Sequence, residues 1–462
     1  MKKFLKRCAI LLAACVVLAG ILALAFYLRF TPRIPAPNFP AARNTAEANQ
    51  QDLQYLRDTF PITDQSLTPA MRPRFYAEID ALKSQVANLS RGELAVGVAR
   101  VVALSDNGHT GLSTSRLRHI PLRFFWFEEG LFVLQTNAEN SDLLGFRVDK
   151  IGSRTPAEIY SQTRPLIPGR EEHKKARSIH FLDSFDALEG LHVVPSSDAV
   201  SVELTAPGGQ RVTRTFKASS GEIPGEGEVD PRFKNGPGCD VTCDWHQLLD
   251  GGTQPLYVQH AAEGYFRAWL EDINALYVRI FAIADVGKQP IKQFFADTIA
   301  EASRKPPRHV IIDLRGNDGG NYLLARSFAK QIDSLVPGKV FIVTDGGTFS
   351  AALVTVAFLK HFAHGRAQIV GQHLGDKEQF WAEGNSVIVL PNSKLRVWVA
   401  TAYHDWEYGC SDWSKCYWIN ILFGVAAGKL DVDLPAPSTF AAYRNGRDES
   451  LDAIRLFLRA RH

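Results

Sequence analysis

Short apolar runs alternate with helical segments along the C-terminal half of the chain, and this alternation is the strongest constraint on its fold. Four runs have the length of strands: "ALYVRIFAI", "RHVIIDLR", "KVFIVTD" and "AQIVGQ". The segments between them have helical composition: "GKQPIKQFFADTIAEASR", "YLLARSFAKQIDSL" and "SAALVTVAFLKHFAHG". Strands that are apolar throughout and separated by helices are typical of a parallel sheet covered on both faces. The sequence therefore predicts an α/β fold for this region.

The N-terminal segment has the composition of a membrane anchor or an export signal. An apolar run from Cys8 to Leu28 is long enough to cross a bilayer. It is preceded by basic residues that would stay in the cytoplasm: Lys2, Lys3, Lys6 and Arg7. The "ALA" at Ala23–Ala25 is alternatively a signal-peptidase site, which would release the body after export. Both alternatives place the body outside the cytoplasm, either at the cell envelope (periplasmic) or secreted.

Length and composition indicate more than one globular domain. The chain has 462 residues, of which 45% are apolar and 22% are charged, the values of a folded protein. That length exceeds one ordinary core. The net charge of +3 gives no reason to expect a nucleic-acid partner. The sequence implies no metal ion and no organic cofactor, and it does not specify an oligomeric state.

Changes of pattern divide the chain into segments. Apolar residues at helical spacing, and a capping box at Ser90 and Glu93, indicate helices near the N-terminus. Short strands with turns follow, and then a stretch rich in Gly, Pro and Glu. We expect, in order, an anchor or signal segment at 1–30, a Pro-rich spacer at 31–44, a helical subdomain at 45–120, a β-rich module at 121–217, a Gly/Pro-rich linker or lid at 218–255, and the α/β region at 256–462.

Four cysteines outside the apolar segment occur as two close pairs, Cys239/Cys243 and Cys410/Cys416. In an oxidising compartment such pairs form local disulfides. A metal site is the alternative, but neither pair has the spacing of a zinc knuckle, and no histidine cluster accompanies them. We expect two disulfides.

Two glycine-rich turns follow neighbouring strands of the predicted sheet. The turn in "IIDLRGNDGGNYLLA" contains Gly319 and Gly320, and the turn in "TDGGTFSAAL" contains Ser350. Ligand sites gather at the carboxyl ends of strands in such sheets, and glycines let backbone amides approach a ligand. Ser350 is either a helix N-cap or a nucleophile at a helix N-terminus. Together the turns predict that Ser350 Oγ lies near the amides of Gly319 and Gly320.

A serine nucleophile needs a base, and two residues are candidates. His109 lies on a polar, glycine-bearing loop, "LSDNGHTGLSTS", of the kind in which functional residues concentrate. Lys377, in "VGQHLGDKEQFWAEG", would act as a base if it were partly buried. An acid would hold the imidazole in the correct tautomer. The candidate acids are Asp405, Glu407, Glu383 and Asp106.

Several of these stretches resemble the tail-specific, or C-terminal processing, serine peptidases (the S41 type) and their tricorn-type relatives. The matching stretches are "VIIDLRGNDGG", "VFIVTDGGTFSAALVTVAFLK", "IVGQHLGDK" and "VIVLPNSKLRV", and "SDNGHT" resembles an Asp-Gly-His-Thr element of the relatives. The resemblance implies a ClpP/crotonase-like βαβ core and a diverged PDZ-type domain in the β-rich module. It also implies Ser350 as the nucleophile, with Gly319 or Gly320 and the Ala351 amide as the oxyanion hole.

The resemblance offers two bases. One branch of the family pairs serine with lysine, and Lys377 falls at the position of that lysine. The other branch pairs serine with histidine and an acid, and His109 matches there. "GQHLGDKEQ" departs from the lysine branch's motif, whereas the motif around His109 is better kept. We therefore favour His109 and keep Lys377 as the alternative.

These observations predict an exported, membrane-anchored serine endopeptidase that acts on extracytoplasmic polypeptides. Residues 8–28 would be its contact with the membrane. The alternative from another class is a catalytically inactive relative that binds peptides as a scaffold at the cell envelope. An acyl-CoA enzyme shares the implied fold, but its substrates are cytosolic, which disagrees with export.

Overall fold

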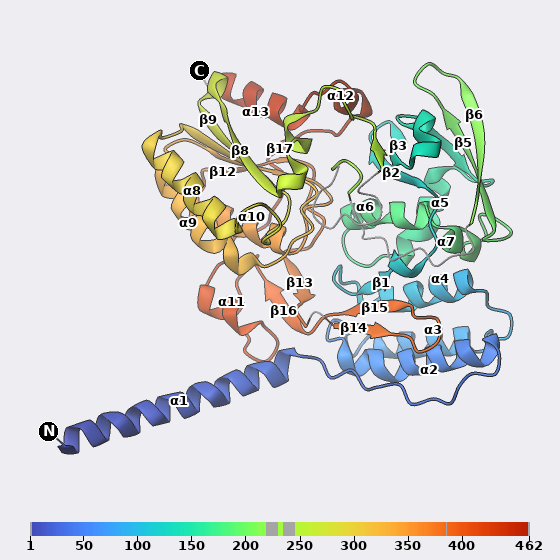
Figure 1. Ribbon diagram of the computed structural model, residues 1–462. Helices are drawn as coiled ribbons and strands as arrows, with labels where there is room; N and C mark the ends of the chain where they lie inside the picture. Colours follow the sequence, from blue (N-terminus) through green and yellow to red (C-terminus); the bar gives the residue numbers. More distant parts are fainter. Residues whose placement is uncertain (1, 219–229, 234–244, 385, 461–462) are drawn as a thin grey trace.

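The computed structural model describes residues 2–218, 230–233, 245–384 and 386–460 (Figure 1). The predicted Cys239–Cys243 disulfide lies outside the described residues, as does most of the predicted linker or lid.

A six-stranded sheet forms the centre of the C-terminal half, in the order β17-β12-β11-β10-β9-β8. The strands are β8 (Tyr265–Leu270), β9 (Ala275–Ile280), β10 (His309–Asp313), β11 (Val340–Thr344), β12 (Ala367–Gly371) and β17 (Leu434–Pro435). Neighbours from β9 to β17 are parallel, and β8 is antiparallel to β9. The four predicted strands are β9 to β12, so the predicted α/β class is confirmed.

Helices cover both faces of this sheet. They are α8 (Ile291–Arg304), α9 (Arg326–Leu335), α10 (Ala351–Phe362), α12 (Phe440–Arg444) and α13 (Glu449–Arg459). Alternate strand residues point to opposite faces. Ile312 and Ile342 belong to the core beneath α8 to α10, whereas Ile311 and Phe341 belong to the core beneath α12 and α13. Burial on both faces explains why these strands are apolar throughout.

Three helices form the N-terminal part of the body: α2 (Thr45–Thr63), α3 (Arg72–Lys83) and α4 (Arg91–Val102). The predicted capping box is confirmed, since Ser90 Oγ accepts from the Glu93 amide at 3.1 Å and the Glu93 carboxylate accepts from the Ser90 amide at 2.9 Å. A three-stranded sheet shares this core, in the order β1 (Gly111–Ser113), β15 (Arg396–Val399) and β14 (Ser386–Val389). The hairpin of β14 and β15 thus pairs with β1 through β15 and fixes the loop before β1.

The β-rich module contains one antiparallel sheet, in the order β2-β3-β4-β5-β6. Its elements are β2 (Leu122–Phe127), β3 (Gly130–Thr136), β4 (Arg147–Ile151), α5 (Pro156–Thr163), α6 (Glu171–Leu182), α7 (Phe185–Gly190), β5 (Ala199–Thr205) and β6 (Arg211–Lys217), and β7 (His246–Gln247) pairs with β3. The short strands follow the sequence pattern, and β5 and β6 pair as an antiparallel hairpin. Its kinship with PDZ domains stays a prediction.

Helix α1 (Lys2–Phe30) projects from the body (Figure 1). Its stretch from Phe4 to Phe30 is long and apolar enough to cross a membrane, and the most apolar part of it is not buried in the body. The following residues, 31–44, lie along the body, because Pro35 and Pro40 carbonyls accept bonds from the Tyr55 hydroxyl (2.6 Å) and the Gln51 amide (3.1 Å). The Pro-rich segment is therefore held against the fold.

The base of α1 packs on a segment closed by a disulfide. Cys410 and Cys416 are bonded, as predicted. This segment lies between β16 (Ala402–Asp405), which pairs with β13 (Gln379–Ala382), and α11 (Trp418–Phe423). The Arg29 guanidinium donates to the Ser414 carbonyl at 2.5 Å. Figure 1 shows β13, β16 and α11 directly beside the end of α1.

Candidate active site

The two glycine-rich turns lie against each other at the carboxyl ends of β10 and β11. Asp345 Oδ1 accepts a hydrogen bond from the Gly316 amide at 2.8 Å, and the Phe349 amide donates to the Asn317 carbonyl at 3.0 Å. These bonds join the turn after β10 to the turn after β11. They bring together the segments that the sequence predicted to meet.

Ser350 occupies a sharp turn at the start of α10. Its φ of 54° and ψ of −124° lie outside the conformations that a serine commonly adopts. Its side chain makes no capping bond to the helix, so capping does not account for the residue. Ser350 is half-buried, and strained backbone of this kind is often found at functional sites.

Gly319 lies directly against Ser350. A Cβ on Gly319 would come within 2.7 Å of Ser350 Cβ and 3.1 Å of Ser350 Oγ, and its φ of 113° also favours glycine. The Gly319 amide, however, donates to Asn317 Oδ1 at 3.0 Å. The same Cβ would lie 3.0 Å from the amide nitrogen of Ala351, the first residue of α10. First-turn helix amides have no acceptor within their helix, so the Ala351 amide is a donor at this position.

The loop carrying His109 is held in place on both sides of the histidine. The Asn107 side chain donates to the Trp381 carbonyl at 3.0 Å and accepts from the Trp381 amide at 2.9 Å. Thr110 donates to the buried carboxylate of Asp64 at 2.8 Å. These bonds join the loop to β13 and to the N-terminal helices.

Replacing Asn107 with alanine is expected to lower the free energy of unfolding by about 1–3 kcal/mol, because the paired amide and carbonyl of Trp381 lose their partner. Chemical denaturation measures the change. Asn88→Ala is the control, since Asn88 is exposed and such substitutions change stability by roughly 0.5 kcal/mol or less. Equal stability of the two variants would contradict the role given to Asn107.

His109 meets the carboxylate of Asp376. Nδ1 of His109 lies 3.3 Å from Oδ2 of Asp376, and their side chains are 16% and 2% exposed. Among the described residues, neither ring nitrogen of His109 has a hydrogen-bond partner. Burial, aided by the charge of Arg177, lowers the pKa of His109 to about 3. Burial raises the pKa of Asp376 to about 7. The imidazole is thus neutral, with Nδ1 facing Asp376 and Nε2 without a hydrogen-bond partner among the described residues.

A column of aromatic rings, most of them stacked, passes through His109. Its ring centroid lies 4.5 Å from that of Phe349 and 4.9 Å from that of Phe380. His404 stacks on the other side of Phe380 at 4.7 Å, and Tyr417 stacks on His404 at 5.9 Å. At the opposite end, His173 stacks on Phe349 at 4.6 Å. The column fixes the plane of the His109 imidazole.

His404 pairs with a second, half-buried acid. Its Nε2 lies 3.6 Å from Glu383 Oε1. Burial raises the pKa of Glu383 to about 7 and, with the nearby His109, lowers the pKa of His404 to about 3. Glu383, one of the acids considered for His109, therefore partners His404 instead.

The other predicted base and acids do not pair with His109. Lys377 pairs with Asp106 at 2.6 Å, and both side chains are exposed, so this pair lies at the protein surface. Asp405 accepts from the Tyr408 amide at 2.8 Å and from Gln379 at 3.3 Å. Glu407 interacts with the hydroxyl of Tyr408. The acid that lies beside His109 is Asp376, which directly precedes Lys377 in the sequence.

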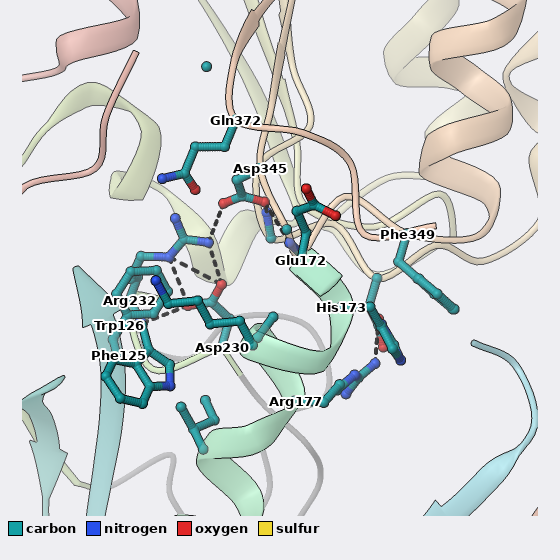
Figure 2. Close-up of a pocket in the computed structure, with 18 of the residues that line it drawn as sticks. Phe125, Trp126, Glu172, His173, Arg177, Asp230, Arg232, Asp345, Phe349 and Gln372 are labelled. Carbon is teal, nitrogen blue, oxygen red and sulfur yellow. Dashed lines mark hydrogen bonds and ion pairs between the residues drawn. The ribbon is translucent and has the colours of Figure 1, made fainter. Parts of the chain in front are cut away.

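A cavity of about 890 Å³ adjoins the two turns, and Gly319 and Phe349 form part of its wall. Aromatic side chains from β2, among them Phe125 and Trp126, form another part. Figure 2 shows Arg232 between the carboxylates of Asp230 and Asp345, with which it pairs at 2.5 and 2.6 Å.

Arg177 reaches the same cavity from α6 and lies beside His173 (Figure 2). It pairs with Asp318 at 2.5 Å. The arginines are thus neutralised by neighbouring acids, and the cavity offers aromatic walls with paired charges.

Sequence reasoning missed Asp376, Asn107 and His404 as parts of this site. Asp376 stands directly before Lys377, and Asn107 stands two residues before His109, so both belong to stretches that the sequence singled out. Their roles depend on contacts with β13 and with the His109 loop. Chain order alone does not reveal those contacts.

No family model matches the chain, and no curated protein matches it. Solved structures of mature CPAF do match. The CPAF structure complexed with lactacystin has a TM-score of 0.59 at 12% identity, over 90% of this chain and 100% of that one. Mature CPAF in another crystal structure has a TM-score of 0.58 at 12% identity, over 90% and 98%. The photosystem II D1 C-terminal processing protease, at 12% identity over 87% and 98%, has a TM-score of 0.35, too low to support a common fold.

Proposed function

From the fold that this chain shares with mature CPAF, we propose that it is a serine endopeptidase of the cell envelope with Ser350 as the nucleophile. The observation that carries the proposal is the strained Ser350 at the start of α10, which lies against Gly319 and makes no capping bond. The resemblance to the tail-specific and tricorn-type peptidases supports the same reaction.

In this proposal Ser350 Oγ attacks the scissile carbonyl and His109 takes its proton. Asp376, at Nδ1, orients the imidazole and stabilises its protonated form. His109 nitrogens without partners are available for this transfer, and catalytic hydrogen bonds commonly tighten only when substrate binds. The imidazole then returns the proton to the leaving amine, and water hydrolyses the acyl-enzyme by the same steps.

Backbone amides would stabilise the oxyanion of the intermediate. The Ala351 amide is the first donor, and the start of α10 favours negative charge there. Gly320 is the second candidate, because the Gly319 amide is bonded to Asn317. Use of Gly319 would require that bond to open.

The substrate in this proposal is an extracytoplasmic polypeptide. The cavity beside Ser350, with its aromatic walls and paired charges, suits an apolar side chain of an extended peptide. Helix α1 is proposed to anchor the protein, with the basic N-terminus in the cytoplasm and the body outside.

Covalent capture tests the proposal. The purified full chain, treated with a fluorophosphonate, should gain one adduct on Ser350, located by mass spectrometry of its peptides. It should also cleave an unfolded protein. Absence of both the adduct and the cleavage would sink the proposal.

An inactive, peptide-binding scaffold is the second candidate. Two observations favour it: the Gly319 amide is engaged by Asn317, and His109 makes no hydrogen bond to Ser350 in this conformation. A chain that binds unfolded polypeptides but takes no fluorophosphonate adduct would support the scaffold.

The pH dependence of cleavage should follow Asp376. Because the pKa of His109 is about 3, the imidazole is neutral from pH 4 upward, whereas Asp376 loses its proton near pH 7. The carboxylate stabilises the imidazolium and the neutral acid does not, so kcat/KM should rise as pH rises through about 7. Measurement of kcat/KM from pH 5 to 9 gives the inflection.

Asp376→Asn removes the titrating group and should abolish that inflection together with most of the activity. Asp405→Asn is the matched control and should keep the wild-type profile. An inflection that persists in Asp376→Asn would assign it to another group.

A further inference from the structure

Exposed apolar side chains lie beside the base of α1. Trp413, within the disulfide-closed segment, is 55% exposed, and Leu422, on α11, is 75% exposed. Soluble proteins carry single exposed apolar residues without consequence. These two residues need an explanation only if they belong to one surface.

Their contacts join them to the end of α1. The Trp418 ring centroid lies 5.8 Å from that of Phe26, 5.6 Å from that of Phe30 and 6.1 Å from that of Trp413. Trp418 and Leu422 are four residues apart on α11 and therefore lie on the same helix face. Trp413, Trp418 and Leu422, together with Phe26, thus form one surface, which we call the α11 surface.

The length of the apolar run sets the height of this surface relative to a bilayer. The 21 residues from Cys8 to Leu28 measure about 32 Å at the helical rise. That length matches the thickness of a hydrocarbon core, which is about 30 Å. If α1 spans the membrane over this run, Phe26 to Phe30 lie at its outer boundary, and the α11 surface lies at the same level.

The C-terminal end of α1 is fixed to the body. Phe30 is 4% exposed, and its carbonyl accepts from the Thr401 hydroxyl at 2.6 Å. With the Arg29–Ser414 bond, this contact fixes where α1 leaves the body. The body therefore cannot move its α11 surface far from the membrane while α1 spans it.

The composition of the surface fits a lipid headgroup region. Tryptophan is enriched at membrane–water interfaces, where one end of its ring system is apolar and the other is wet. Arg29 and the exposed Lys415 add positive charge beside the tryptophans, and this charge attracts the phosphate groups of lipids. The adjacent Asp412 is bonded to the Ser414 amide and hydroxyl.

We propose that the α11 surface is a second membrane contact, in which Trp413 and Leu422 insert into the interface of the bilayer that α1 spans. The inference rests on the proposed membrane anchoring of α1. It gives the body two points of attachment and hence one orientation toward the lipid.

Site-specific photocrosslinking tests this contact in the full chain, reconstituted into vesicles of equal parts phosphatidylcholine and phosphatidylglycerol. The crosslinker p-benzoylphenylalanine replaces Trp413 or Leu422, one at a time. Leu456 is the matched control, since it is 70% exposed and belongs to α13, a helix at the far end of the body from α1 (Figure 1). Leu18 in α1 reports on the anchor itself. An unchanged thermal unfolding midpoint qualifies each variant.

Lipid adducts at Trp413 and Leu422, several-fold above those at Leu456, would support the second contact. Adducts at Leu18 with background levels at both test positions would overturn it and leave the anchor intact. Adducts to protein in place of lipid would overturn it in favour of a protein partner. Absence of adducts at Leu18 would remove the anchor and this inference together. The peptidase proposal has its own readout in fluorophosphonate capture.

Discussion

Replacing Ser350 with alanine is expected to abolish cleavage, with kcat lowered by roughly 10⁶-fold, because no other group at the start of α10 can form the acyl-enzyme. The fold should survive, since the Ser350 side chain makes no capping bond and its loss leaves no buried partner without a hydrogen bond. Cleavage of an unfolded protein substrate, followed over time, measures the loss.

Ser334→Ala is the control for this substitution. Ser334 is an exposed serine on α9 whose hydroxyl donates to a carbonyl of its own helix. That variant should cleave at the wild-type rate. Wild-type cleavage by Ser350→Ala would mean that the activity arises elsewhere in the protein or from a contaminant.

Replacing His109 with alanine is expected to cause a loss of similar size, also roughly 10⁶-fold in kcat, because nucleophile and base act as one unit. The double variant Ser350→Ala/His109→Ala should then be no slower than either single variant. Single-turnover measurements with an ester substrate would show whether acylation is the step that fails.

Lys377→Ala discriminates between the two candidate bases. The Lys377 ammonium pairs with Asp106 at the protein surface, so its removal should leave kcat close to the wild-type value. Loss of activity in Lys377→Ala with retention in His109→Ala would reverse the assignment. Loss of activity in both variants would leave the base unassigned between the two residues.

The α/β core could be predicted from local patterns. Strands β9 to β12 are apolar because both faces are buried, and that pattern is visible without a structure. β8 was missed, since "YFRAWL" is half exposed beyond its first residues and lies at the sheet edge. The two-residue β17 is too short to leave a pattern.

The site was predictable where two turns follow neighbouring parallel strands and unpredictable where segments distant in the sequence meet. Gly319 and Ser350 could be placed together, because parallel strands end at the same edge of a sheet. The partner of His109 could not be identified, because Asp376 reaches it through the pairing of the His109 loop with β13. Local sequence offered Asp405, Glu407, Glu383 and Asp106, whereas long-range packing places Asp376 beside His109.

The buried junction between α1 and the body has a consequence for the choice of cleavage point. A body on a flexible linker would sample many heights above a bilayer. Here Phe30 is packed into the fold, so the proposed anchoring would hold Ser350 at one fixed distance from the bilayer surface. Substrates tethered to the same bilayer would then be cut at a set distance from it, and residues inserted between a substrate's own anchor and its cleavage point would shift the cut along its sequence.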